Sequence, residues 1–171
     1  MSVERRLFPV DLPQQRALLR ALLALDGSTT RVCEAVVRQP VQVLLHHQDE
    51  TQNVPDAVRE QLGGSAWLAR VTSLHAGGQV LMDNLSYTRL DAVPADFLRR
   101  MHEGQAPIGH LLQGLFVRRE VVAGSAQIAQ ALWAHVGQAD AQASRAYRIV
   151  MPEGPLMLIF EAFRGGLVQA P

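Results

Sequence analysis

The sequence predicts an α+β domain in which an antiparallel sheet of about six strands is covered by helices. Three pairs of β-rich runs, each joined by a short turn, predict three hairpins. Segments with apolar residues at helical spacing lie between these pairs and predict the covering helices. The chain has 171 residues, 48% of them hydrophobic and 19% charged, so residues 1–171 are expected to form one globular domain.

The first helix is predicted from Asp11 to Leu25. Asp11 is a suitable N-cap, and Asp26-Gly27 is a typical stop. Leucines at helical spacing give the segment one apolar face: Leu18, Leu19, Leu22 and Leu23. This face is expected to pack against the sheet.

The first hairpin is predicted from the runs TTRVCEAVV and VQVLLHHQ. Arg38-Gln39-Pro40 separates the runs and supplies the turn. The segment DETQNVPDAVREQLGG follows, and it is expected to be a loop with a short helical piece.

The second hairpin is predicted from SAWLARVTSL and QVLMDNLSYTRL around Ala76-Gly77-Gly78. A helix is expected to open at Pro94, since proline is favoured in the first turn, and to end at Gly104.

The last third of the chain predicts two helices and the third hairpin. A short helix is expected in IGHLLQGLF, and a longer one runs from its cap at Ser125 to Gly137. SRAYRIVM and PLMLIFEAF then flank a short turn and form the hairpin.

Two charged residues interrupt apolar strands. Period-two alternation groups residues on one face of each strand: Met157, Ile159, Glu161 and Phe163 in one, Leu68, Arg70, Thr72 and Leu74 in the other. If both faces border one cavity, a guanidinium and a carboxylate meet there. A buried ion pair joining two strands and a functional site are equally favoured by this spacing.

Composition excludes several classes of function. The formal net charge of zero argues against a nucleic-acid binder. Cys33 is the single cysteine, so no internal disulfide forms, and no Cys/His cluster has zinc-ligand spacing. The start MSVERRLFPVD lacks a signal-peptide core and no run reaches membrane-spanning length, so a soluble, cytoplasmic protein is expected.

Other polar residues have simpler interpretations. Arg118-Arg119-Glu120 is interpreted as a solvated end, and Trp67 and Trp133 as core residues. Tyr147 and Arg148 could line a pocket, but alternation does not say which of them does so.

Four stretches together resemble the chorismate pyruvate-lyase family, in particular its short bacterial members that make 4-hydroxybenzoate. They are LLALDGSTTRV, WLARVTSL, QAPIGHLL and PLMLIFEAF. Their order and spacing carry the resemblance, which extends from about residue 12 to residue 163.

The resemblance implies a helix-covered antiparallel sheet that encloses a ligand cavity, and a lyase that removes the side chain of chorismate as pyruvate. It implies a small-molecule carboxylate as substrate, no metal or organic cofactor, and a role in ubiquinone or secondary-metabolite biosynthesis. It places the carboxylate-binding Arg on Arg70 and the catalytic Glu on Glu161. Further ligand contacts fall on Thr29, Ile108 and Gly109, where backbone groups touch the ligand.

Several alternatives remain open at this point. Arg89 or Arg148 could hold the carboxylate instead of Arg70. The same cavity could serve another elimination or a cyclisation, or bind a small molecule without catalysis, as a sensor domain does. A degenerate member with only an interaction role ranks last, and the sequence does not decide between monomer and dimer.

Overall fold

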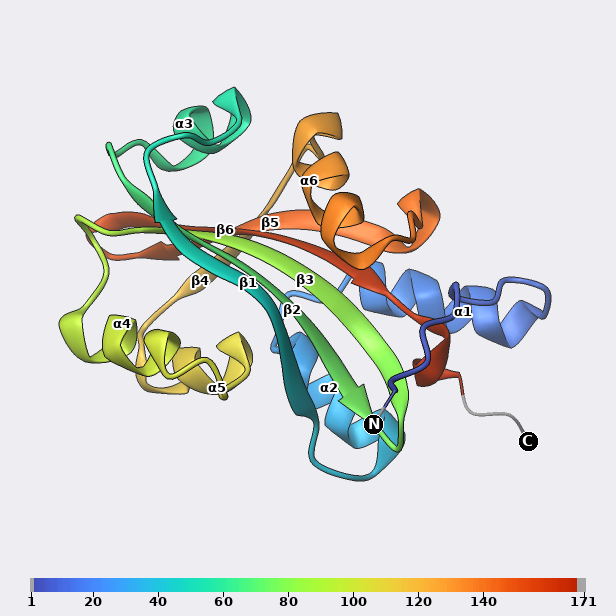
Figure 1. The fold of residues 1–171 in the computed structure, drawn as a ribbon. Helices are drawn as coiled ribbons and strands as arrows, with labels where there is room; N and C mark the ends of the chain where they lie inside the picture. Colours follow the sequence, from blue (N-terminus) through green and yellow to red (C-terminus); the bar gives the residue numbers. More distant parts are fainter. Residues whose placement is uncertain (1, 169–171) are drawn as a thin grey trace.

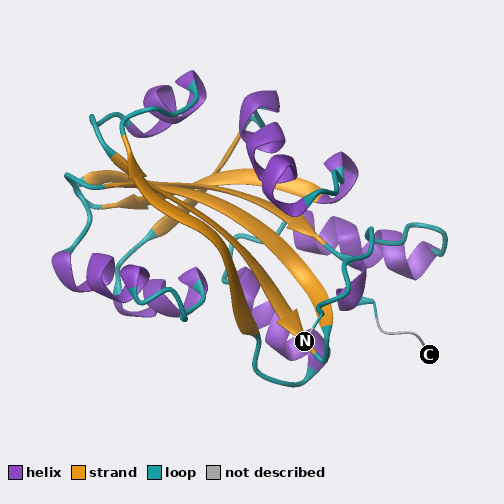
Figure 2. Ribbon diagram, in the orientation of Figure 1, coloured by secondary structure: helices purple, strands orange, loops and turns teal. Residues whose placement is uncertain are grey.

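The computed structural model describes residues 2–168, which form a six-stranded antiparallel sheet with helices on both faces (Figures 1 and 2). The strand order is β1-β2-β3-β6-β5-β4. The strands are β1 (Gln42–Thr51), β2 (Trp67–Ala76), β3 (Gln79–Arg89), β4 (Arg118–Val122), β5 (Ser144–Met151) and β6 (Gly154–Phe163). The helices are α1 (Pro13–Leu23), α2 (Thr29–Val37), α3 (Asp56–Leu62), α4 (Ala95–His102), α5 (Ile108–Leu111) and α6 (Ala126–Val136). The predicted α+β class is therefore confirmed.

Two of the three predicted hairpins are confirmed, and the first is wrong. β2 pairs with β3, and β5 with β6, as the turns predicted. The segment TTRVCEAVV forms α2 instead of a strand. The Ser28 hydroxyl caps this helix by accepting a hydrogen bond from the Arg31 N–H (3.4 Å), and Cys33 and Val37 bury one face at helical spacing.

The sixth strand comes from a segment not predicted to be a strand. β4 pairs with β5 along the edge of the sheet and contains Arg118, Arg119 and Glu120, which were expected to be a solvated end. β1 forms the opposite edge, because its expected hairpin partner is α2.

The predicted helices are present with small shifts at their ends. α1 begins at Pro13 and its N-cap is Leu12 instead of Asp11; the Gln15 side chain accepts the Leu12 N–H at 2.9 Å. α4 follows Pro94, and Gly104 beyond it has a φ of +74°. None of the helices within residues 2–168 has both the length and the apolar character that crossing a membrane requires.

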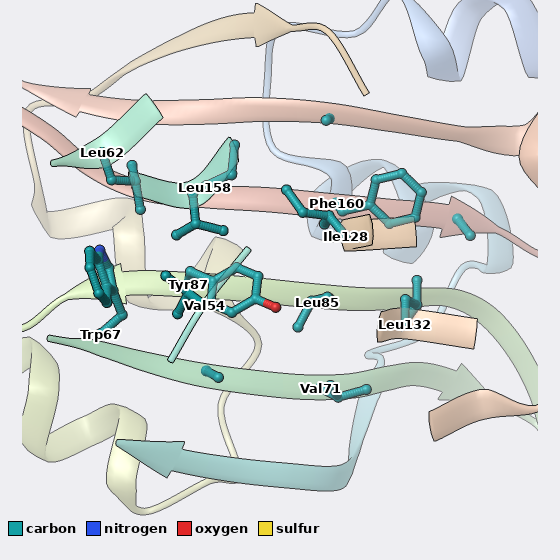
Figure 3. Close-up of a cluster of buried hydrophobic side chains, with 14 of the residues drawn as sticks. Val54, Leu62, Trp67, Val71, Leu85, Tyr87, Ile128, Leu132, Leu158 and Phe160 are labelled. Carbon is teal, nitrogen blue, oxygen red and sulfur yellow. The ribbon is translucent and has the colours of Figure 1, made fainter. Parts of the chain in front are cut away.

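α3 and α6 cover one face of the sheet and form a continuous hydrophobic core with it (Figure 3). Trp67, Val71, Leu85, Tyr87, Leu158 and Phe160 project from the strands toward these helices. Leu62 of α3 and Ile128 and Leu132 of α6 pack against them. Trp67 is thus a core residue, as predicted.

The other face, covered by α2, α4 and α5, carries two separate hydrophobic clusters. One joins α1 and α2 to Leu74, Met82 and Phe163, and the other joins α4 and α5 to Leu68 and Met157. Between the clusters lies a polar belt, which we define as Arg70, Thr72, Asn84, Ser86 and Glu161, all buried. This belt is the unusual feature of the fold, because buried polar groups require partners.

A buried charge network on the α6 side ties the chain ends to the sheet. The Asp83 carboxylate is 0% exposed and accepts hydrogen bonds from Nε of Arg164 (2.7 Å) and Nε of Arg5 (2.9 Å). Ser73 Oγ also donates to it. Arg5 reaches α6 through the Val136 carbonyl oxygen (3.2 Å). The charge of the fully buried Arg164 is therefore compensated.

Asp83→Asn should destabilise the protein strongly, because it leaves the Arg164 charge buried without a carboxylate. We expect the free energy of unfolding to fall by about 3–5 kcal/mol, measured by chemical denaturation. Asp91→Asn is the matched control: Asp91 pairs with Arg89 at the surface (2.9 Å), and its loss should cost at most about 1 kcal/mol. Equal losses in the two variants would show that burial of the Asp83 network contributes nothing.

Candidate functional site

Antiparallel pairing arranges the polar belt in two adjacent rows across the sheet. One row is Thr72–Asn84–Glu161–Arg145, and the next is Arg70–Ser86–Ile159–Tyr147. Paired residues of antiparallel strands project to the same face, so Arg70 and Glu161 share one. Arg70 and Glu161 lie in adjacent rows, on strands that are two strand spacings apart. The two spacings alone separate their backbones by about 10 Å.

Glu161 is fully buried and its ionic partner is Arg145. Arg145 Nε lies 3.6 Å from Glu161 Oε2, and Thr29 Oγ1 donates to Glu161 Oε1 at 3.2 Å. Arg145 Nη2 in turn donates to Thr29 Oγ1 at 3.1 Å. An ion pair between Arg70 and Glu161, which the spacing had favoured equally with a functional site, is therefore wrong.

Only a weak sequence signal points to Arg145. The turn pairs Met151 with Gly154, and continuing this register would set Arg145 opposite Phe160, whose side chain lies in the core under α6. A register shift between Ile149 and Val150 moves Arg145 opposite Glu161. A β-bulge, which sequence alternation does not reveal, thus brings the pair together.

Arg70 is buried without a carboxylate partner among residues 2–168. It is 1% exposed, and its Nη2 donates to the carbonyl oxygens of Gly104 and Ala106, each at 3.1 Å. Its Nε and Nη1 are buried and donate to nothing in the described chain. Burial lowers the pKa of Arg70 to about 10, so the group remains charged at neutral pH. Unused N–H groups on a buried guanidinium are suited to an anionic ligand.

Other unpartnered polar atoms gather on the same face. Ser86 Oγ, Asn84 Oδ1 and Glu161 Oε2 are buried without a hydrogen bond in the described chain. Buried polar groups of native proteins are nearly all satisfied by protein or water. Their concentration beside Arg70 therefore indicates a site for a polar ligand.

A small cavity lies between the sheet and the first turns of α2 and α5. Its lining is Thr29, Thr30, Thr72, Leu74, Met82, Asn84, Ile108, Gly109, Leu112, Arg119, Tyr147 and Ile159. Thr29, Ile108 and Gly109, which the sequence singled out, line this cavity together. Arg70 and Glu161 are not among its lining residues, although Glu161 accepts a hydrogen bond from Thr29. The cavity volume is about 20 Å³, room for one water molecule. A ligand larger than water would require some of the residues around this cavity to move.

Gly109 sets how closely these two helices approach. A Cβ atom at position 109 would lie 2.4 Å from Thr30 Oγ1 and 2.8 Å from Ser28 Oγ, so only glycine fits. His110 Nε2 of α5 also contacts Glu34 Oε2 of α2 at 3.2 Å. The two segments therefore form one cover over the cavity.

The remaining arginines that could have held the carboxylate lie elsewhere. Arg89 pairs with Asp91, and Arg148 donates to Glu120 Oε2 at 2.6 Å, outside the polar belt. Tyr147 lines the cavity, and burial, with the nearby Glu161 carboxylate, raises its pKa well above the ordinary value. Of Tyr147 and Arg148, the tyrosine is the one that faces the site.

Residues 2–168 contain no group of three His, Cys, Asp or Glu side chains placed to hold a metal ion. The chemistry available in the described site therefore consists of guanidinium groups, one carboxylate, hydroxyls and an amide. Such a set can bind an organic acid and move a proton.

Two solved structures of one bacterial protein share the fold of this chain. PhnF from Mycobacterium smegmatis is 15% identical, with a TM-score of 0.52, and the match covers 99% of this chain and 91% of that chain. The effector domain of PhnF from the same organism is 16% identical, with a TM-score of 0.50, covering 81% of this chain and 89% of that chain. At these identities the likeness shows the fold alone. No curated protein matches the chain.

Sequence comparison with protein families gives a more specific result. The profile of the family described as "Chorismate pyruvate-lyase Rv2949c-like" matches residues 23–170. That range includes both strands of the polar belt that carry charge, β2 and β6, and the two segments of the cover. The chain belongs to the Rv2949c-like chorismate pyruvate-lyase family.

Proposed function

We propose that the chain is a chorismate pyruvate-lyase, which converts chorismate to 4-hydroxybenzoate and pyruvate. The observation that carries this proposal is the buried Arg70, whose Nε and Nη1 have no partner within residues 2–168, on the same sheet face as the buried Glu161. Membership of the family supports the choice of substrate.

Arg70 is proposed to orient the substrate by its ring carboxylate. Nε and Nη1 lie on different edges of the guanidinium plane, so each would donate its own charge-assisted hydrogen bond, and the carboxylate of the substrate would accept one of them. The hydrogen bonds of Nη2 to Gly104 and Ala106 already hold the fork in place. The Arg70 side chain is thus already ordered in the free protein, which lowers the entropic cost of ligand binding.

Glu161 is proposed to transfer the proton. The ring carbon that bears the hydroxyl loses its hydrogen as a proton, and the C–O bond on the neighbouring carbon breaks. The electron pair of the C–H bond becomes the last ring double bond, and the departing enolpyruvate gains a proton on its CH₂ carbon to become pyruvate. The step requires no oxidant or reductant, and the formation of the aromatic ring drives it. A positioned acid/base contributes about 10²–10⁴-fold to such a step.

Arg145 and Thr29 hold Glu161 in position for this step. Arg145 lies near Oε2 and Thr29 donates to Oε1, so the sheet and the first turn of α2 both orient the carboxylate. A movement of α2 during ligand entry would therefore displace Thr29 and change the hydrogen bond that Glu161 accepts from it.

Ligand binding without catalysis is the second candidate function. The fold is shared with the effector domain of PhnF, and a fold of this kind can hold a ligand without transforming it. Another elimination or a cyclisation by the same site is a variant of the first candidate, with a different acid in the cavity.

Incubation of the purified protein with chorismate tests the proposal. We expect equal amounts of pyruvate and of 4-hydroxybenzoate, measured by an enzyme-coupled pyruvate assay and by chromatography. Chorismate binding without pyruvate release would support the second candidate. If the protein neither binds chorismate nor releases pyruvate, the proposal is contradicted.

Glu161→Gln should abolish most turnover while leaving product binding nearly intact. The amide keeps the shape of the side chain but does not accept the proton, so kcat should fall about 10²–10⁴-fold. Glu120→Gln is the matched control, since Glu120 is also paired with arginines but lies outside the cavity. Parental kcat in Glu161→Gln would refute the role of Glu161, and retained 4-hydroxybenzoate binding would show that the variant is folded.

Arg70→Ala should weaken the binding of both chorismate and 4-hydroxybenzoate, because both carry the ring carboxylate. Loss of a buried, charged partner predicts about a 100-fold rise in Kd, measured by calorimetry. Arg89→Ala, which removes a surface arginine, should leave both values unchanged. Unchanged affinity in Arg70→Ala would mean that another group binds the carboxylate.

A further inference from the structure

Arg119 is the one charged side chain in the lining of the cavity. It lies on the edge strand β4 opposite Ile149 of β5, which places it on the face of the polar belt. Its neighbours Arg118 and Glu120 project to the other face, where Glu120 contacts Arg118 and Arg148. Arg119 therefore has no access to the nearest carboxylate on its own strand.

One nitrogen of Arg119 also lacks a hydrogen-bond partner in the described part of the chain. Its Nε is buried and donates to nothing within residues 2–168. The cavity lining contains hydroxyls, an amide and apolar groups, but no Asp or Glu. Arg119 is partly exposed, so solvent reaches its charge, but an anion that enters the cavity would accept a charge-assisted hydrogen bond from the buried Nε.

The charges on this face leave two guanidinium groups uncompensated. Glu161 is the partner of Arg145, which accounts for one positive charge and one negative charge. Arg70 and Arg119 remain, each with at least one buried N–H group that has no acceptor in the described chain. A ligand that neutralises both carries two acidic groups.

Arg70 and Arg119 lie on strands toward opposite edges of the sheet. β2, which carries Arg70, and β4, which carries Arg119, are separated by four strand spacings in the sheet. That corresponds to about 19 Å between their backbones. Asn84, Ile159 and Tyr147, which line the cavity, lie on the strands between β2 and β4.

We infer that Arg119 is a specificity-determining residue that binds the second carboxylate of a dicarboxylate substrate. The inference rests on the proposed function: in chorismate this second group is the carboxylate of the enolpyruvyl side chain. Elimination detaches that carboxylate with pyruvate, so the aromatic product keeps only its contact with Arg70. Arg119 thus favours substrate over product and assists product release.

Calorimetry with two ligands tests this assignment in the Glu161→Gln background, where turnover is slow. Adding Arg119→Gln should raise the Kd for chorismate at least about 10-fold, as expected for loss of a charged partner, and change that for 4-hydroxybenzoate less than about 2-fold. Adding Arg118→Gln is the matched control. Arg118 is the exposed neighbour on the same strand, and both Kd values should stay within about 2-fold of the background.

Each result has one meaning. A chorismate Kd that Arg119→Gln leaves unchanged, or changes as much as the 4-hydroxybenzoate Kd, overturns the role of Arg119 and leaves the proposed function standing. Absence of chorismate binding in the parent protein, with Arg119 intact, overturns the proposed function itself and this inference with it. Retained 4-hydroxybenzoate binding shows that the Arg119 variant is folded.

Discussion

Burial of a guanidinium that has no carboxylate partner is the constraint on which the site depends. An unpaired charge in a protein interior is unfavourable, and it is tolerated where hydrogen bonds and a ligand offset the cost. Arg70 receives part of that compensation from the carbonyl oxygens of Gly104 and Ala106, and two of its nitrogens remain free. The affinity proposed for an organic acid arises from this unmet requirement.

The two faces of the sheet differ in how their buried charges are compensated. On the α6 face, Asp83 accepts from Arg164 and Arg5, and the network fixes the chain ends to the sheet. On the face of the polar belt, Arg145 and Glu161 form a pair, while Arg70 and Arg119 keep unused donors. The first face uses charge for stability, and the second retains the capacity to bind an anion.

The cover over the site links binding to movement. The cavity holds about one water molecule, and the contact of Gly109 with Ser28 and Thr30 closes it. Since Thr29 Oγ1 donates to Glu161 Oε1, a displacement of α2 would also change the surroundings of this carboxylate. For the proposed lyase, a closed cover would exclude water from the reacting carbon and so strengthen the electrostatic interactions around it.

The α+β class, the hairpins β2–β3 and β5–β6, and the unusual positions of Arg70 and Glu161 could be predicted from the residues alone, because period-two alternation and turn residues are local signals. The same local signals misassigned α2, whose β-branched residues have strand propensity, although capping by Ser28 and burial of Cys33 and Val37 favour a helix. The pairing of Glu161 with Arg145 and the place of Arg119 at the cavity became visible in the folded chain. The first depends on a β-bulge and the second on which strand forms the sheet edge, and both are set by contacts between segments distant in the sequence.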